Sequence, residues 1–352
     1  MTDVPLSVLD LAPVAASGTT REALQHTTTL ARRVEQLGYR RFWVAEHHNM
    51  PGIASSAPAV LLAHLAAATS TIRIGSGGVM LPNHAPLVVA EQFGTLQALH
   101  PDRIDLGIGR APGTDQATAL ALRRTMAGLN AEAFPQELAT LISYFRGDPG
   151  PIRATPGAGQ MPAIWLLGSS GFSAQLAGTL GLPFSFAHHF SPANTLPALA
   201  LYRQHFRPSV WLDEPYAMVA VNVICADTDA RAEWLSGPSG LAFLRLRAGR
   251  PESLVSPEEA AAYPYTDLER DFVRQRHDGQ ALGSPATVRR ALTELAERTG
   301  ADELMLTTFV YDVADRVRSF ELVAEAMAGD TTAGGDTTAG SVTTGTGGPG
   351  TS

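Results

Sequence analysis

Short apolar runs alternate with longer helical segments along the first 328 residues of the chain. Runs rich in β-branched and aromatic residues, bounded by turn residues, have the composition and length of buried strands. Such strands are predicted at residues 5–11, 41–45, 71–81, 104–108, 163–167, 184–187, 216–225 and 303–308. The segments between them carry helical caps and glycine stops. Helices are predicted at residues 20–37, 58–69, 86–99, 168–181, 192–206, 283–299 and a last one to 328, with two helical pieces leading to 146 and a proline-broken helical section at 227–276.

This alternation favours an α/β fold in which helices cover an all-parallel sheet. Eight strand–helix units point to a (β/α)8 TIM barrel. A doubly wound open sheet is the alternative, but that fold usually carries a G-x-G-x-x-G turn after its first strand. The turn after Leu11 lacks this signature. We therefore predict one barrel domain over residues 1–328, with insertions after some strands.

Residues 329–352 have a different composition. This segment contains the hexamer GDTTAG twice in succession and hardly any apolar side chain. It cannot bury enough apolar surface to offset the entropy of ordering, so we predict a disordered low-complexity tail.

Composition narrows the class of protein. The net charge of −8 argues against a general affinity for nucleic acid or anionic membranes. The single cysteine, Cys225, excludes an internal disulfide and fits a reducing compartment. No apolar run reaches transmembrane length, and the first residues lack a secretory signal pattern. We expect a cytoplasmic protein. Because the chain has no lysine, a catalytic Schiff base is excluded.

Residues suited to chemistry follow the ends of the predicted strands. Loops at the carboxyl ends of the strands form the active site of a TIM barrel. Glu46, His47 and His48 follow the second strand, Gly77 and Gly78 the third, Arg110 the fourth, Ser169 and Ser170 the fifth, and His188 and His189 the sixth. We expect these residues to converge at one end of the barrel.

The third strand breaks at residues 75–78, Gly-Ser-Gly-Gly, before Val79 resumes it. Glycine in a strand marks a bend of the backbone or a place where another molecule lies against it. Two interpretations follow: a bulge or tight turn, or a flat ligand resting on bare peptide. The polar residues at neighbouring strand ends favour the ligand.

Residues 168–173, Gly-Ser-Ser-Gly-Phe-Ser, have the composition of a phosphate-binding helix start. Small residues expose the free amides of a helix N-terminus, and hydroxyl groups add donors. Ordinary N-capping by Ser169 or Ser170 is the alternative. Arg110 favours phosphate, because a guanidinium at a strand end of an apolar barrel needs an anionic partner. A plain surface arginine is the alternative there.

His47 and His48 are adjacent, so in an extended segment their side chains face opposite ways. We therefore expect one imidazole to face the cavity and the other to pack outside, without a shared metal site. A cavity imidazole can move protons near neutral pH, whereas a structural histidine has no such role. For His84, His188 and His189 the two roles stay open.

The chain lacks a G-x-S-x-G elbow, a cysteine nucleophile with matched spacing, a Walker loop and a zinc ligand set. It nevertheless presents a predicted phosphate site beside bare backbone. A phosphorylated cofactor that carries the reactivity itself explains this combination best.

Four stretches carry a family resemblance: FWVAEHHNMPG, RIGSGGVMLPNHAP, DLGIGRAPGTD and WLLGSSGFSAQLAGTLGLPF. In this order they resemble successive motifs of the bacterial luciferase-like flavin monooxygenases, closest to the branch that includes natural-product monooxygenases. The resemblance runs over about residues 6–327. It implies that His47 is the catalytic histidine beside the flavin ring, with Glu46 next to it. It also implies a non-proline cis peptide between Gly77 and Gly78 beneath the ring.

The same resemblance implies how the phosphate of FMN is held. Arg110 matches the arginine that binds this phosphate, and Ser170 and Ser173 match its hydroxyl and amide donors. Ser169 keeps a backbone role, because luciferase has a glutamate at that position. Gly168 and Gly171 belong to the same loop and are also expected to bind the cofactor. Luciferase has a reactive cysteine where this chain has Gly109, so light emission is not implied.

The implied reaction is oxygenation of a small organic substrate. Reduced FMN, delivered by a separate flavin reductase, meets O₂ and forms a C4a-hydroperoxide while the closed pocket excludes water. His47 would stabilise that intermediate or shuttle a proton. The rivals are hydride transfer with deazaflavin F420 and a non-catalytic flavin-binding protein. A homodimer is also implied, paired through apolar helices such as 58–69 and 86–99, whose alternative role is packing on the barrel.

Overall fold

The structure is a computed structural model that describes residues 4–111, 115–123 and 131–328. Its strands are β1 (Leu6–Asp10), β2 (Arg41–Val44), β3 (Arg73–Met80), β4 (Ile104–Gly109), β5 (Ala163–Gly168), β6 (Phe184–Phe186), β7 (Ala217–Cys225), β8 (Ala281–Gly283) and β9 (Glu303–Thr307). Its α-helices are α1 (Thr20–Gln36), α2 (Pro58–Ala68), α3 (Pro86–Leu99), α4 (Gln116–Arg123), α5 (Phe134–Arg146), α6 (Gly171–Leu180), α7 (Thr195–His205), α8 (Asp229–Arg247), α9 (Pro257–Ala262), α10 (Asp267–His277), α11 (Pro285–Thr299) and α12 (Val313–Ala328). The predicted tail at residues 329–352 lies outside the described residues.

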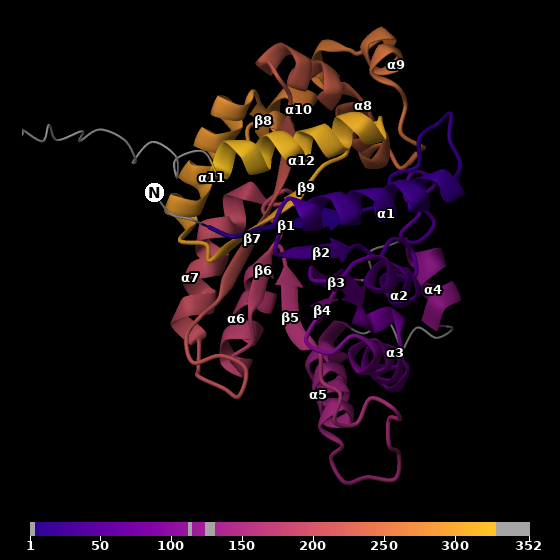
Figure 1. The fold of residues 1–352 in the computed structure, drawn as a ribbon, viewed down its shortest axis with the longest axis vertical. Coiled ribbons are helices and arrows are strands. Elements are labelled where there is room, and N and C mark those ends of the chain that lie inside the picture. Colours follow the sequence, from indigo (N-terminus) through magenta and orange to yellow (C-terminus); the bar gives the residue numbers. More distant parts are fainter. Residues whose placement is uncertain (1–3, 112–114, 124–130, 329–352) are drawn as a thin grey trace, which may run out of the picture.

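Within the described residues, eight parallel strands close into a barrel that helices surround (Figure 1). The strand order is β6-β5-β4-β3-β2-β1-β9-β7, and pairing of β6 with β7 completes the ring. The additional strand β8 pairs in parallel with the carboxyl-terminal end of β7. The predicted TIM barrel is confirmed, and the closed ring rules out the open sheet.

The predicted strands differ from the observed ones by at most two residues at either end. The strand β8 was not predicted, because its three residues are too few to show a period of two. The predicted break in β3 is confirmed only in part. This strand runs from Arg73 to Met80 and pairs with β2 as far as Ser76 and with β4 up to Met80, but its register with β4 shifts between Gly77 and Val79.

Side chains alternate along the strands between an outer and an inner layer. Outward residues such as Val8, Phe42 and Ile74 pack beneath the helices in the main hydrophobic core. Inward residues fill the middle of the barrel: Leu9, Trp43, Ala45, Trp165, Met218, Ala220 and Met305. The rings of Trp43 and Trp165 meet edge to face with centroids 5.4 Å apart. This inner layer separates the two ends of the barrel.

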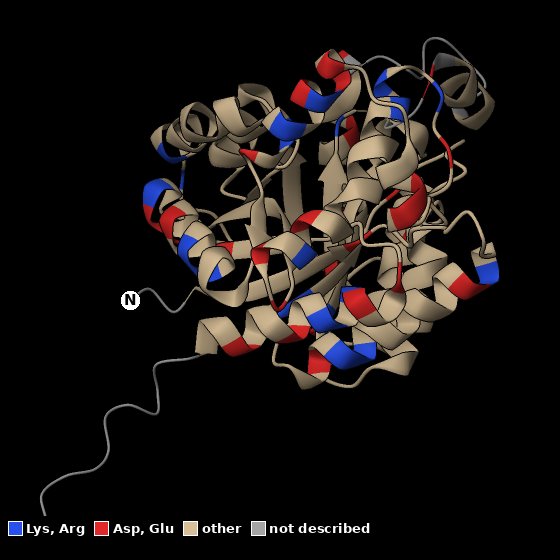
Figure 2. Cartoon of the chain, turned by 90° about the horizontal axis from the view of Figure 1, so that it is seen from above, with Lys and Arg blue, Asp and Glu red and all other residues tan. Residues whose placement is uncertain are grey.

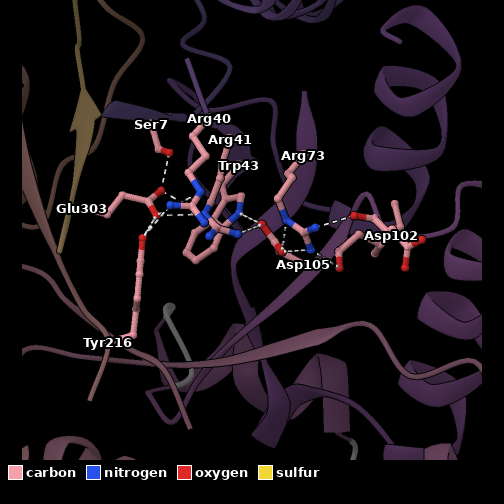
Figure 3. A network of polar contacts seen from close by, with 10 residues as sticks. Ser7, Arg40, Arg41, Trp43, Arg73, Asp102, Asp105, Tyr216 and Glu303 are labelled. Atoms are coloured by element: carbon pink, nitrogen blue, oxygen red, sulfur yellow. Dashed lines mark hydrogen bonds and ion pairs between the residues drawn. The ribbon is translucent and has the colours of Figure 1, made fainter. Parts of the chain in front are cut away.

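A buried network of charges fills the amino-terminal end of the barrel (Figure 3). Arg41 donates from Nε to Glu303 Oε1 and from Nη1 to Asp105 Oδ2, both over 2.9 Å. Arg73 and the indole Nε1 of Trp43 donate to the same Asp105 carboxylate. Burial by itself lowers the pKa of Arg41, but the two carboxylates outweigh it and raise that pKa. The network lies at the first positions of the strands, opposite to their carboxyl ends.

Basic and acidic residues are mixed over the outer helices, without an extended block of either sign in this view (Figure 2). Among the described residues, no helix is both long and apolar enough to cross a bilayer.

Candidate functional site

A cavity of about 200 Å³ opens at the carboxyl-terminal end of the barrel. Its floor is formed by inward residues of the barrel, among them Leu9, Trp43 and Met305. The predicted site residues that line it are His47, Gly77, Gly78, Arg110, Gly168, Ser169, Ser170 and Ser173. Of the predicted residues, Gly171 and Glu46 do not belong to this lining. The structure thus brings together at one wall most of the residues that the strand ends singled out.

The peptide bond between Gly77 and Gly78 is cis, as the family resemblance implied. Gly77 lies opposite Gly107 of β4, but Val79 lies opposite Ile108, so Gly78 is an extra residue in a bulge. A Cβ on Gly78 would lie 2.4 Å from Leu167 Cδ1 and 2.8 Å from the Gly107 carbonyl oxygen. Packing inside the barrel therefore requires glycine here, and the same bare backbone also faces the cavity. The bulge interpretation of these glycines is confirmed, and the ligand interpretation stays a prediction.

The amino end of α6 points its small residues at the cavity. Ser170 is the N-cap residue, yet within the described chain its side chain makes no capping hydrogen bond. N-capping therefore does not explain why a hydroxyl group occupies this position. Ser170 lines the cavity together with Ser169 and the buried Ser173. The first amides of a helix lack intrahelical partners and attract anions. This corner of the cavity is suited to a phosphate group.

Arg110 faces the same corner from the end of β4. Its guanidinium lies 4.3 Å from the ring centroid of Phe172, the second residue of α6, and it lines the cavity. Among the described residues no carboxylate forms an ion pair with it. The aromatic contact fixes the guanidinium next to the start of α6, where its charge adds to the free amides and hydroxyl groups.

A second cavity, of about 650 Å³, adjoins the first. Leu11, His47, His189 and Phe190 line both cavities. The outer wall of the larger cavity comes from the section between β7 and β8, with residues of α8, α10 and the loop after α8. These helices lie together at one end of the molecule (Figure 1). A flat cofactor in the smaller cavity would therefore leave the larger one for another molecule.

His47 stands at the junction of the two cavities. Its backbone N–H donates to the Ser55 carbonyl oxygen over 3.0 Å, and Ser55 in turn donates to the Ala45 carbonyl. These bonds fix the segment just past β2. The prediction that the second histidine packs outside is wrong in part, because His48 also lines the larger cavity. The segment after β2 is irregular rather than extended, so strict alternation does not apply to it.

Glu46 lies behind the cavity wall and is fully buried. Its carboxylate accepts hydrogen bonds from His84 Nε2 at 2.8 Å, His48 Nε2 at 2.9 Å and the Met80 N–H at 3.0 Å. Burial would raise the pKa of Glu46, but these hydrogen bonds prevail and lower it. The glutamate thus joins the segment after β2 to the end of β3. Its predicted catalytic role is untested, and this placement is that of a positioning residue.

His189 is the site residue that sequence reasoning left open. It lines both cavities, whereas His188 is buried and bonded to Thr195 Oγ1 through Nδ1 at 2.7 Å. Burial lowers the pKa of His189 to about 4, so its imidazole is neutral near pH 7. Nδ1 lies 3.1 Å from the Ala220 carbonyl oxygen. A neutral ring that donates there carries no proton on Nε2, which can then accept a hydrogen bond.

Fold and site together define a TIM-barrel protein with two adjoining cavities at the carboxyl ends of its strands, the smaller of which has a corner suited to an anion. The chain belongs to the luciferase-like monooxygenase family, whose model matches residues 4–303. A luciferase-like monooxygenase of Escherichia coli (strain K12) is 49% identical over 329 residues, covering 92% of this chain and 98% of the relative. The N-acetyl-S-alkylcysteine monooxygenase of Bacillus subtilis (strain 168) is 34% identical over 332 residues, with 92% and 98% covered. The family resemblance of the four sequence motifs is confirmed.

Solved structures agree with this family assignment. The crystal structure of apo-MsnO8 is 40% identical, covers 92% of this chain and 98% of its own, and superposes with a TM-score of 0.86. Two more distant structures share the fold alone. They are the oxygenating constituent of 3,6-diketocamphane monooxygenase from Pseudomonas putida in complex with FMN, 20% identical with a TM-score of 0.71, and an F420-dependent secondary alcohol dehydrogenase, 13% identical with a TM-score of 0.63.

Proposed function

We propose that this protein is a flavin-dependent monooxygenase that uses reduced FMN and O₂ to oxygenate a small organic substrate. The observation that carries the proposal is the smaller cavity, where an arginine and an uncapped serine-rich helix start face the bare backbone of β3. A 34% identical relative is named a monooxygenase, which supports oxygenation as the type of reaction.

The residues present fit a phosphorylated flavin. Arg110, Ser170 and Ser173 would hold the phosphate, because they offer a fixed guanidinium, a hydroxyl outside the helix cap and the amides of α6. The flat surface of Gly77 and Gly78 and the apolar floor of the cavity suit an aromatic ring. When bound, reduced FMN would supply the electrons that activate O₂.

The chain itself would orient the reactants and control protons. His47, at the junction of the cavities, can hold or transfer a proton between the cofactor side and the substrate side. His189 would accept a hydrogen bond at Nε2. The apolar walls limit water around the reacting atoms. Glu46 would act through the segment it holds in place rather than by contact with substrate.

The remaining partners belong to the same proposal. A separate flavin reductase would deliver reduced FMN in the reducing cytoplasm. Two copies of the chain would pair through α2 and α3, which expose large apolar side chains: Val60 at 71%, Val88 at 44% and Leu99 at 65% of their area. Such surface is more than packing on the barrel requires.

Flavin titration tests the cofactor assignment. Oxidised FMN should bind the purified protein more tightly than riboflavin, which lacks the phosphate, and more tightly than F420. Fluorescence quenching measures the three affinities.

In the Arg110→Ala variant, FMN should bind about 10- to 100-fold more weakly, the range for losing a hydrogen bond to a charged group. The affinity for riboflavin should change little, so the preference for the phosphate disappears. Arg207→Ala, at an exposed site far along the chain, serves as the control. Tighter binding of F420 than of FMN, with no O₂ consumed, would support the F420 rival; equal binding of FMN and riboflavin by the native protein would contradict the phosphate site.

A further inference from the structure

Arg276, on α10, lines the larger cavity. The guanidinium carbon lies 3.9 Å from the ring centroid of Phe243 on α8, and that ring stacks on Phe272 with centroids 5.6 Å apart and planes 6° from parallel. The side chain is thus held against the cavity wall by the contact between α8 and α10, and it is half-buried.

Within the described residues this cation has no anionic partner. Its Nε is buried without a hydrogen bond, and no ion pair joins Arg276 to any of the described residues. Burial lowers the pKa of its guanidinium to about 10, so the group is still charged at neutral pH. A buried charge without a counterion is costly, and proteins retain one where a ligand supplies the opposite charge.

The carboxylates that line the same cavity are already engaged. Asp115 accepts hydrogen bonds from Asn49 Nδ2 at 3.1 Å and from the N–H and hydroxyl of Thr118 at 2.9 and 2.6 Å. Glu252 forms an ion pair with Arg245 over 2.9 Å. The other titratable groups of this lining are His47, His48 and His189, which add no negative charge. The positive charge of Arg276 is therefore not neutralised within the cavity.

The rest of the cavity suits an apolar molecule. Its lining includes Met50, Ile53, Ala242, Leu246 and Phe309. At about 650 Å³, it has the size of a small-molecule site. His47 and His189, which border the smaller cavity, also line it. A ligand held at Arg276 would extend its apolar part toward this junction.

We propose that Arg276 binds the carboxylate of the substrate, and that the substrate is a small organic acid whose apolar part reaches the junction at His47. The acid is a substrate only if the proposed function holds, so this inference rests on that function. The binding of an organic acid does not itself depend on flavin. Arg276 is then a specificity-determining residue, since an isosteric neutral compound leaves its guanidinium unpaired.

Binding of matched acids and amides tests the proposal. The probes are hexanoate, 1-naphthoate and N-acetyl-S-butylcysteine, each compared with its primary amide by calorimetry on the flavin-free protein. At least one acid should bind about tenfold or more tightly than its amide, as expected for a hydrogen bond to a charged group. Saturating FMN should leave this preference in place, which separates Arg276 from the phosphate corner at Arg110.

Three variants identify the residue responsible. Arg276→Met should abolish the preference for acids, and Arg276→Lys should retain part of it. Arg274→Met is the matched control, because Arg274 lies on the same helix, pairs with Asp271 and does not belong to the lining of the larger cavity. Thermal melting of each variant establishes that it folds.

The proposal is overturned if none of the acids binds, if acid and amide bind equally, or if the preference survives in Arg276→Met. These outcomes are independent of the flavin titration. Failure of FMN to bind would contradict the proposed function and leave the acid preference measurable, whereas tight binding of FMN without an acid preference would contradict the role of Arg276 alone.

Discussion

Replacement of His47 by alanine is expected to lower kcat for substrate oxygenation about 10²- to 10⁴-fold, the usual contribution of a positioned acid–base group. The reason is its position, since His47 lines both the smaller cavity and the larger one. The affinity for FMN should stay close to that of the native protein, because the proposed phosphate contacts come from Arg110 and the start of α6. Under turnover with reduced FMN, product formed per O₂ consumed is the quantity to measure.

In this variant O₂ should still be consumed, but hydrogen peroxide should replace the product. His205→Ala provides the control, because this histidine ends α7 and contributes to neither cavity lining. His48→Ala is a sharper comparison, as its imidazole lines the larger cavity and supports Glu46. Undiminished oxygenation by His47→Ala would remove this residue from the chemistry while leaving the cofactor assignment intact.

Replacement of Arg41 by methionine is expected to lower the free energy of unfolding by about 3–5 kcal/mol, the range for breaking a buried charge network. Arg41 bridges Asp105 and Glu303 over 2.9 Å each, and its side chain is 6% exposed. Its loss leaves both carboxylates buried with one fewer cation. Because Arg73 and Arg40 remain near them, the lower end of the range applies.

Urea unfolding followed by circular dichroism measures this change. Arg41→Lys should have an intermediate effect, since an ammonium group keeps the charge but cannot span both carboxylates with the planar fork of arginine. Arg270→Met removes an exposed arginine paired with Asp267 and should change stability by less than about 0.5 kcal/mol. A native-like unfolding midpoint for Arg41→Met would show that the network adds little to stability.

Those residues of the candidate site that lie close to the ends of strands could be predicted from the sequence. Arg110 and Ser170 closely follow predicted strands, and Ser173 lies in the first turn of the helix after one of them, so the position of the strand ends was enough to place them at one end of the barrel. Glu46 shows the limit of this reasoning. It is adjacent to His47 in sequence, but His48, His84 and the Met80 N–H draw its carboxylate behind the wall. Those contacts join the segment after β2 to the end of β3 and the residues that follow it, and no local pattern records the contacts between the two.

The sequence by itself determined the barrel, the extent of its main strands and the end at which the site forms. Periodicity of two and of 3.6 residues records which face of each element is buried, and parallel strands all end on the same side. Only the tertiary structure decided which side chains meet across loops. The place of Arg276, and that of His189 between the two cavities, were decided in this way, because the cavity walls include the loop after β6, α8 and α10, and contacts between such distant segments leave no trace in any one of them.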